Sequence, residues 1–441
     1  MEAVDTLLHA RWIVPVEPQG LVLENHSLAI KDGRIHDILP AEDAKQRYSA
    51  QHTQHLAQHM LIPGFINAHT HAAMTLFRGL ADDLPLMEWL SDHIWPAEAA
   101  WVNYDFVSDG TQLAIAEMIR GGTTCFNDMY FFPDETARVA SQFGMRTCVG
   151  MIVIDFPTIW AKDSDEYIHK GLEVHDYYRN NPLVTTAFAP HAPYTVSDTP
   201  LERIVTLADQ LDIPIHIHAH ETADEVEQSL KQHQIRPLQR LEGLGLMSPH
   251  LMTVHMTQLT THEIQRLSAT SCHVVHCPES NLKLASGFCP VAQLLEAGVN
   301  VALGTDGAAS NNDLDMLGEM KTAALLAKAV ANDASAVTAE QALAMATLNG
   351  AKALGLDQEI GSLVKGKAAD ITAVNFADLE SQPIYHPISH LVYASSRHQV
   401  SDVWINGHQV LRQRELTQMD EKEIYKKTQV WRDKIAKSDT H

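Results

Sequence analysis

The stretch Ile213-Pro-Ile-His-Ile-His-Ala-His-Glu221 decides how the middle of this chain folds. Isoleucines alternate here with His216, His218 and His220, and successive side chains of a β-strand point to opposite faces. The pattern therefore predicts a strand with its histidines facing inward and its isoleucines packed against outer helices. Buried imidazoles need polar partners. We expect His218 to be a metal ligand near the carboxyl end of the strand. His216 is expected to be a hydrogen-bonded core residue, and His220 a structural residue beyond the mouth.

Strand-like runs of this kind recur along the chain and alternate with helical segments. The eight runs are 64–69, 123–128, 146–152, 183–189, 213–218, 251–255, 272–276 and 299–304, and clear helical segments include 111–120, 198–211 and 260–269. Eight alternations over roughly 240 residues match the length of a (β/α)₈ barrel of the TIM type. A doubly wound open sheet would alternate similarly, but no glycine-rich phosphate loop follows the first strand. The sequence thus predicts an α/β protein built on a barrel.

Both ends of the chain are rich in β-structure. Asp32-Gly33 joins two apolar runs within 28–38, and Asn406-Gly407 follows the run 400–405, each a strong hairpin signal. We expect the two ends to form one small β-sandwich, with the barrel inserted between them. The expected limits are 1–62 and 366–441 for the two parts of the sandwich and 63–365 for the barrel, with a helical tail after Thr417.

Composition excludes several classes of protein. Acidic residues outnumber basic ones 55 to 32, which gives a formal charge of −23 and repels nucleic-acid backbones and anionic lipid. The five cysteines form no CxxC pair, which suits a reducing compartment. Neither a signal peptide nor an apolar membrane span is visible. We expect a cytoplasmic protein with no nucleic-acid polymer and no membrane as partner. The sequence is also compatible with a homo-oligomer.

Polar residues gather at the ends of four predicted strands. His69 and His71 end the first, two positions apart and therefore on one face. His218 and His255 end two others, and Asp306 follows the last, in the layer where barrel enzymes carry their catalytic groups. Nitrogen and carboxylate ligands without a thiolate, and with one position open for water, describe a catalytic zinc-type site. Glu221 could overhang that site.

The segment Leu86-Met-Glu-Trp-Leu90, with Trp95, permits two interpretations. It could form a wall against a bound ligand. Its spacing also fits an amphipathic helix that packs on the barrel, which is the preferred interpretation.

These motifs resemble those of a known family. His69-Thr-His71, His218-Ala-His-Glu221, His255 and Thr305-Asp306-Gly307 resemble the metal-site signature of the amidohydrolase superfamily. Within it, the sequence is most similar to the methylthioadenosine/S-adenosylhomocysteine deaminases. That similarity covers nearly the whole chain and is carried by 63–71, 95–98, 189–194, 276–281 and 304–312.

The resemblance implies a role for each candidate residue. It implies metal ligation by His69, His71, His218 and Asp306, catalysis by Glu221, His255 and Asp306, and substrate contacts from Glu98, His191, Glu221 and Asp306. Relatives with two metal ions place a lysine at the end of strand four, and the run 183–189 has none. We therefore expect one divalent ion per chain, with zinc as the first choice. The arginine that some members place near the substrate has no clear match.

The implied reaction is the metal-dependent hydrolytic deamination of an adenine nucleoside. The candidate substrates are 5′-methylthioadenosine, S-adenosylhomocysteine and adenosine, and the products are the hypoxanthine nucleoside and ammonia. Three alternatives remain at this point: an aminohydrolase acting on guanine, cytosine or a triazine; a catalytically inactive barrel that serves as a binding module; and an ester or phosphate hydrolase, a class that commonly needs two ions.

Overall fold

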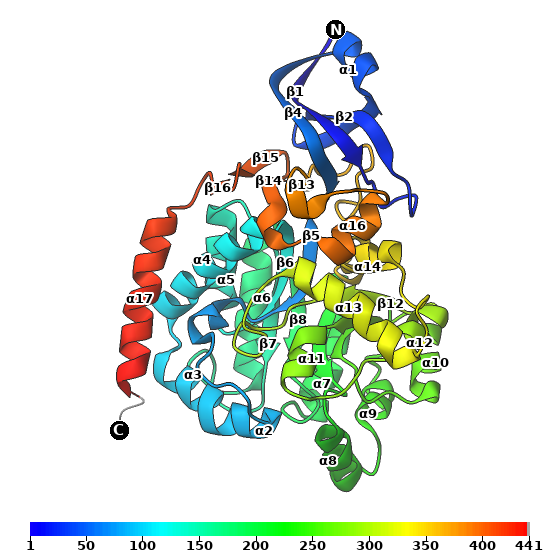
Figure 1. Ribbon diagram of the computed structural model, residues 1–441. Helices are drawn as coiled ribbons and strands as arrows, with labels where there is room; N and C mark the ends of the chain where they lie inside the picture. The colour runs from blue at the N-terminus through cyan, green and yellow to red at the C-terminus, as the bar shows by residue number, and fades with distance from the viewer. Residues whose placement is uncertain (439–441) are drawn as a thin grey trace.

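The chain forms a parallel barrel and a separate mixed sheet (Figure 1). The computed structural model describes residues 1–438. The barrel strands follow one another in chain order: β5 (Phe65–Thr70), β6 (Thr123–Met129), β7 (Arg146–Val153), β8 (Val184–Pro190), β9 (Ile215–Ala219), β10 (Leu251–His255), β11 (His273–His276) and β12 (Asn300–Leu303). All eight predicted strands are present, within one to two residues of their expected limits. The predicted barrel is confirmed.

Helices surround the barrel and fill its loops. They are α4 (Tyr104–Arg120), α5 (Pro133–Gln142), α6 (Ser164–Tyr178), α7 (Asp198–Leu211), α8 (Ala223–His233), α9 (Pro237–Gly243), α10 (Thr261–Ala269), α11 (Pro278–Lys283), α12 (Val291–Glu296), α13 (Met316–Ala331), α14 (Ala339–Met345) and α15 (Leu348–Ala353). Helix α7 has its expected limits. Helix α4 begins well before the expected residue 111, because the Asn103 side chain accepts a hydrogen bond from the Phe106 N–H (3.0 Å) and caps it.

An excursion between β5 and α4 carries four short helical segments: η1 (Ala72–Phe77), α2 (Leu86–Glu88), η2 (Trp89–Ile94) and α3 (Trp95–Trp101). Segments α2, η2 and α3 follow one another without a break, and η2 is a π-helix. In Figure 1 this helical arm lies at the end of the barrel remote from the mixed sheet. The arm is helical, as the spacing of its apolar residues predicted.

The mixed sheet joins the two ends of the chain. Its strands are β1 (Glu2–Ile13), β2 (Leu23–Lys31), β3 (Arg34–Pro40), β4 (Tyr48–Pro63), β13 (Ile371–Asn375), β14 (Val400–Ile405), β15 (His408–Arg412) and β16 (Glu415–Leu416), and the helices beside it are α1 (Ala41–Arg47) and α16 (Pro387–Ala394). β4 lies in the middle, parallel to β1 and antiparallel to β13. The hairpin signals hold: Asp32 and Gly33, like Asn406 and Gly407, have positive φ angles. Helix α17 (Glu421–Ser438) then runs along α4.

Side-chain and backbone hydrogen bonds close the barrel between its first and last strands. The Asn67 amide donates to Thr305 Oγ1 (2.7 Å) and accepts from the Thr305 N–H (3.0 Å). The Asp306 N–H donates to the His69 carbonyl (3.0 Å). At Gly304 a Cβ atom would lie 2.7 Å from the backbone nitrogen of His69. Only glycine therefore lets the two backbones approach so closely. The closure brings the ends of β5 and β12 together. No helix within residues 1–438 is long and apolar enough to cross a membrane.

A buried ion pair links the barrel to the mixed sheet. Arg146, at the start of β7, donates from Nε to Asp370 Oδ2 (2.8 Å) and from Nη2 to Asp370 Oδ1 (3.2 Å). Their side chains are only 7% and 2% exposed. The same carboxylate accepts the Asn406 N–H (2.7 Å) and so holds the turn between β14 and β15.

Replacing Asp370 by Asn should lower the free energy of unfolding by about 3 kcal/mol or more, since it leaves a buried guanidinium without its counter-charge. Urea denaturation would measure the change. Glu24→Gln is the matched control, because Glu24 pairs with Arg11 on the surface with 57% of its side chain exposed. That change should cost under about 1 kcal/mol. Equal, small losses in both variants would contradict a stabilising role for the Arg146–Asp370 pair.

Candidate metal centre and active site

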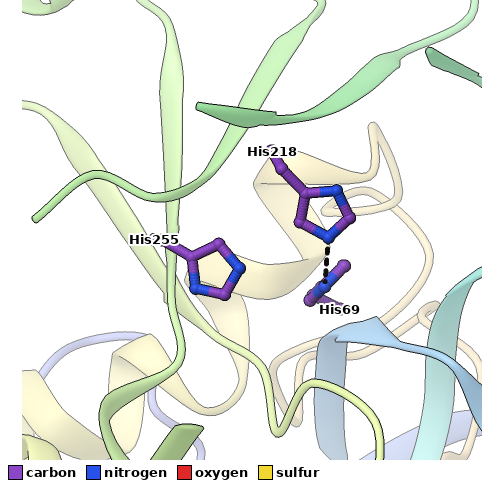
Figure 2. A group of neighbouring side chains, drawn as sticks. All are labelled: His69, His218 and His255. Carbon is purple, nitrogen blue, oxygen red and sulfur yellow. Dashed lines mark hydrogen bonds between the residues drawn. The ribbon is translucent and has the colours of Figure 1, made fainter. Parts of the chain in front are cut away.

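Histidines from three strands converge at the carboxyl end of the barrel (Figure 2). His69 Nε2 and His218 Nε2 lie 3.1 Å apart, and His255 faces the same point from β10. Potential ligand atoms of these three residues all lie within 4.8 Å of one another. The alternating pattern in β9 thus delivers His218 to this cluster at the carboxyl end of the strand, as predicted.

A second group overlaps the first and adds a negative charge. Asp306 Oδ1 lies 3.3 Å from His69 Nε2 and 3.2 Å from His71 Nε2. These atoms again lie within 4.8 Å of one another. Burial alone would raise the pKa of Asp306, but hydrogen bonding to His69 and His71 holds it well below its usual range. Asp306 is therefore an ionised carboxylate directed at the histidines.

Two of the imidazoles, His71 and His218, direct Nε2 toward the cluster. His218 Nδ1 donates to the His191 carbonyl (2.7 Å), and His71 Nδ1 donates to the Met129 carbonyl (2.5 Å). A carbonyl oxygen only accepts, so Nδ1 carries the proton and Nε2 offers its lone pair toward the cluster. Burial lowers the pKa of His218 well below its usual range, which keeps the ring neutral. Neutral nitrogen ligands, a carboxylate and no thiolate fit a divalent ion such as zinc.

His216 and His220 do not join the cluster. His216 is fully buried one layer deeper, where its Nε2 lies 2.9 Å from His69 Nδ1, so its prediction as a hydrogen-bonded core residue is confirmed. The position predicted for His220 is wrong. Its side chain is buried instead of lying beyond the mouth, because β9 ends at Ala219 and a φ of +53° breaks the alternation. Its Nε2 accepts the Leu238 N–H (2.9 Å), which is a structural role.

Glu221 and His255 face each other beside the cluster. His255 Nε2 lies 3.8 Å from Glu221 Oε2, and both side chains are buried. Burial raises the pKa of Glu221, which favours its protonated form. The Glu221 backbone is fixed, since its N–H donates to Glu225 Oε2 (2.7 Å) and its carbonyl accepts from Thr257 Oγ1 (2.7 Å). The geometry therefore places a buried carboxyl group, on a fixed backbone and with a raised pKa, at the edge of the ligand group.

Two supporting residues were missed by the sequence analysis, which quoted their stretch only as part of a resemblance. Ser280 Oγ donates to Asp306 Oδ2 (2.7 Å), and Asn281 Oδ1 lies 2.8 Å from His255 Nδ1. Both lie on α11, directly after β11, and both are buried. Only their position could have indicated this role. They follow directly after the end of a barrel strand, where other strands carry the ligands.

A cavity of about 580 Å³ opens onto the cluster. His191 lines it, with its ring 5.0 Å from that of His218, and burial lowers the pKa of His191 to about 3. Glu98 lines it as well, from helix α3. Burial raises the pKa of Glu98 to about 7, although the Tyr130 hydroxyl and His71 oppose the shift.

The helical arm contributes a wall of this cavity. Leu86, Trp89, Leu90 and Trp95 all line it. The preferred interpretation of this segment, a helix that only packs on the barrel, is therefore wrong. Its residues have a helical spacing, but the arm lies across the mouth and turns its apolar side toward the site.

Comparisons with known proteins agree with this geometry. The sequence matches the amidohydrolase family over residues 60–410. It is 53% identical to a protein of Saccharophagus degradans described as 5-methylthioadenosine/S-adenosylhomocysteine deaminase, over 98% of this chain and 97% of that one. A protein of Teredinibacter turnerae with the same description is 51% identical, over 98% of each chain. The structure of a protein described as an adenosine deaminase of Xanthomonas campestris, with bound zinc, superimposes with a TM-score of 0.98, 55% identity and 99% of each chain covered. This chain belongs to the amidohydrolase family.

Proposed function

We propose that this chain hydrolytically deaminates an adenine nucleoside in a metal-dependent reaction. The candidate substrates are 5′-methylthioadenosine, S-adenosylhomocysteine and adenosine, and the products are the hypoxanthine nucleoside and ammonia. The observation that carries the proposal is the convergence of the ligand group and a buried, protonatable Glu221 on one cavity. The descriptions of the similar proteins support the same reaction.

The proposed ligands of the ion are His69, His71, His218 and Asp306. Their donor atoms converge, and the rings of His71 and His218 direct Nε2 at the cluster. Against the effect of burial, Asp306 raises the pKa of His71 to about 9, so a bound ion would displace a proton from this ring. A divalent ion bound there would supply an acidified water at neutral pH. One zinc ion per chain is proposed, because no lysine follows β8, where relatives with two ions carry one.

The proposed proton transfers use three side chains of the chain. Asp306 accepts a proton from the attacking water, and His255, held by Asn281, orients that water. Glu221 donates a proton to N1 of the adenine ring, which lets C6 accept the oxygen. The proton taken up by Asp306 then passes to the amino group with the help of Glu221, the C6–N bond breaks, and ammonia leaves. The proton of the new C6 hydroxyl returns to Glu221 as the C6 carbonyl forms. The raised pKa of Glu221 suits it for the first donation.

Glu98 and His191 are the proposed substrate contacts outside the ligand group. A carboxylate accepts hydrogen bonds from two adjacent hydroxyls, and ribose offers such a pair at C2′ and C3′. Neutral His191, whose Nδ1 lies 3.0 Å from Thr195 Oγ1, faces the cavity beside His218.

We further propose the domain limits 1–62, 63–365 and 366–441, and a location in the cytoplasm. All five cysteines are free and buried, which suits a reducing compartment.

Metal analysis of the purified protein should find close to one divalent ion per chain. His69→Ala and Asp306→Ala should each lose both the ion and the activity, since each removes a ligand. His169→Ala is the control, because His169 is 73% exposed on α6. Two tightly bound ions per chain, or an unchanged metal content in both ligand variants, would contradict the assignment.

The wild-type protein should release ammonia from adenosine or a 5′-thio derivative, and Glu221→Gln should lower kcat at least ~10²-fold with the metal retained. The amide keeps the shape of the side chain but cannot donate the proton. Ammonia release and metal content are measured together. Glu227→Gln, on the exposed face of α8, is the matched control. Near wild-type turnover by Glu221→Gln would refute the proton-transfer scheme. Ammonia release from guanine or cytosine alone would refute the substrate class.

Glu98→Ala should lower kcat/KM for a nucleoside ~10²-fold or more, because two hydrogen bonds to a charged group contribute about 1.5–3 kcal/mol each. The 2′,3′-dideoxy analogue lacks both hydroxyls and should lose little. Steady-state kinetics with both compounds separates the two cases. Equal losses on the two compounds would show that Glu98 does not contact the ribose.

A further inference from the structure

One buried carboxyl group near the active site has no part in the proposed reaction. Glu319, on helix α13, is completely buried, and the acids Glu279 and Asp313 lie close enough to oppose its ionisation. Burial and these neighbours raise the pKa of Glu319 well above its usual range. A polar group in such a place costs free energy unless hydrogen bonds compensate for the lost water. The hydrogen bonds of Glu319 therefore indicate its role.

The two oxygens of Glu319 join two separate segments of the chain. Oε1 accepts from the side-chain amide of Asn311, in the loop after β12. Oε2 accepts from the backbone N–H of Glu279 (3.3 Å), at the start of α11. A carboxyl group offers two acceptor atoms whether or not it is protonated, whereas an amide side chain offers only one. Glutamine in this place would turn its own NH₂ group toward one of the two donors.

The first of these segments leads to Asp306 through the backbone. Asn311 Nδ2 donates to the Thr305 carbonyl (2.7 Å) as well as to Glu319. Thr305 directly precedes Asp306 in the chain. The loop that carries Asp306 is therefore tied to helix α13 through Glu319.

The second segment leads to Asp306 through a side chain. Ser280 follows Glu279 in α11, and its Oγ donates to Asp306 Oδ2 (2.7 Å). The other oxygen of this carboxylate, Oδ1, lies 3.3 Å from His69 Nε2, in the ligand cluster. The position of α11 thus helps to determine which oxygen of Asp306 faces the histidines.

We propose that Glu319 is a positioning residue of the metal centre. By holding Asn311 and the start of α11 together, it orients the carboxylate of Asp306 toward the bound ion. This inference rests on the proposed function, because it requires Asp306 to be a ligand. Loss of a hydrogen-bonding partner behind a ligand typically lowers metal affinity or activity by about 10–100-fold.

The first test measures zinc affinity by competition with a chelator, which does not depend on turnover. Glu319→Gln should weaken zinc binding ~10-fold or more, because Asp306 loses its fixed orientation. Asp313→Asn is the matched control and should bind zinc as the wild type does. Asp313 lies near Glu319, but its carboxylate accepts the Asp315 N–H (3.0 Å) and pairs with Arg397.

Urea denaturation of the metal-free proteins separates a positioning role from a merely structural one. A structural role would lower the stability of Glu319→Gln and leave the zinc affinity of the folded protein unchanged. Unchanged affinity in Glu319→Gln, or an equal loss in Asp313→Asn, would overturn the inference.

The second test changes the partners of the buried carboxyl group. Asn311→Ala and Ser280→Ala should each weaken zinc binding, since each breaks one path to Asp306. The double variant Glu319→Gln/Ser280→Ala should lose less than the product of the two single losses, because both changes act on one carboxylate. Losses that multiply would overturn the inference. If Glu319→Gln does not fold, Asn311→Ala decides, and wild-type affinity in that variant would overturn the inference.

Asp306→Ala separates this inference from the proposed function. Loss of zinc in Asp306→Ala together with wild-type affinity in Glu319→Gln overturns only the positioning role. Zinc bound with wild-type affinity by Asp306→Ala would overturn the ligand assignment, and the positioning role with it.

Discussion

The hydrogen bond from the Asp306 N–H to the His69 carbonyl joins the two ends of the barrel, and the site depends on it. It fixes the distance between a carboxylate that follows the last strand and an imidazole that ends the first. Asn67 and Thr305 support the same closure from below. Because Gly304 leaves room for this approach, the first and last strands supply ligands to one point although the chain between them is more than two hundred residues long. His218 of β9 and His255 of β10 then complete the cluster around His69.

Burial gives the residues of the site opposite protonation states. Taking a group out of water disfavours its charged form, so His218 and His191 stay neutral, while the pKa of Glu221 is raised and that of Glu98 is raised to about 7. Asp306 escapes this trend, because two imidazoles hydrogen-bond to it. One cavity thus holds neutral imidazoles such as His218, the ionised carboxylate of Asp306, and the Glu221 carboxyl group with its raised pKa. Two carboxyl side chains, Glu221 and Asp306, can therefore act as acid and as base in the same cavity.

Much of this arrangement could be predicted from the sequence because strands have a strict two-residue period. The alternation around His216 and His218, and the ends of the neighbouring strands, identified the barrel and its polar rim. Prediction failed where backbone geometry departs from that period, as at His220, whose positive φ turns its side chain into a structural pocket. Prediction also failed for helices, because the spacing of apolar residues identifies a helix but not the surface that its apolar side contacts. Ser280 and the helical arm show this, since only their tertiary placement reveals what they contact.

The position of β4 has a consequence for how the protein is made. β4 pairs with β1 on one side and with β13 on the other, and β13 lies beyond the whole barrel in the sequence. During synthesis the first four strands emerge early, yet one edge of β4 has no partner until the barrel has been translated. An exposed strand edge is a template for wrong pairing, and contacts so distant in the chain form slowly. The nascent amino-terminal segment must therefore keep an open edge while the ribosome completes the catalytic domain.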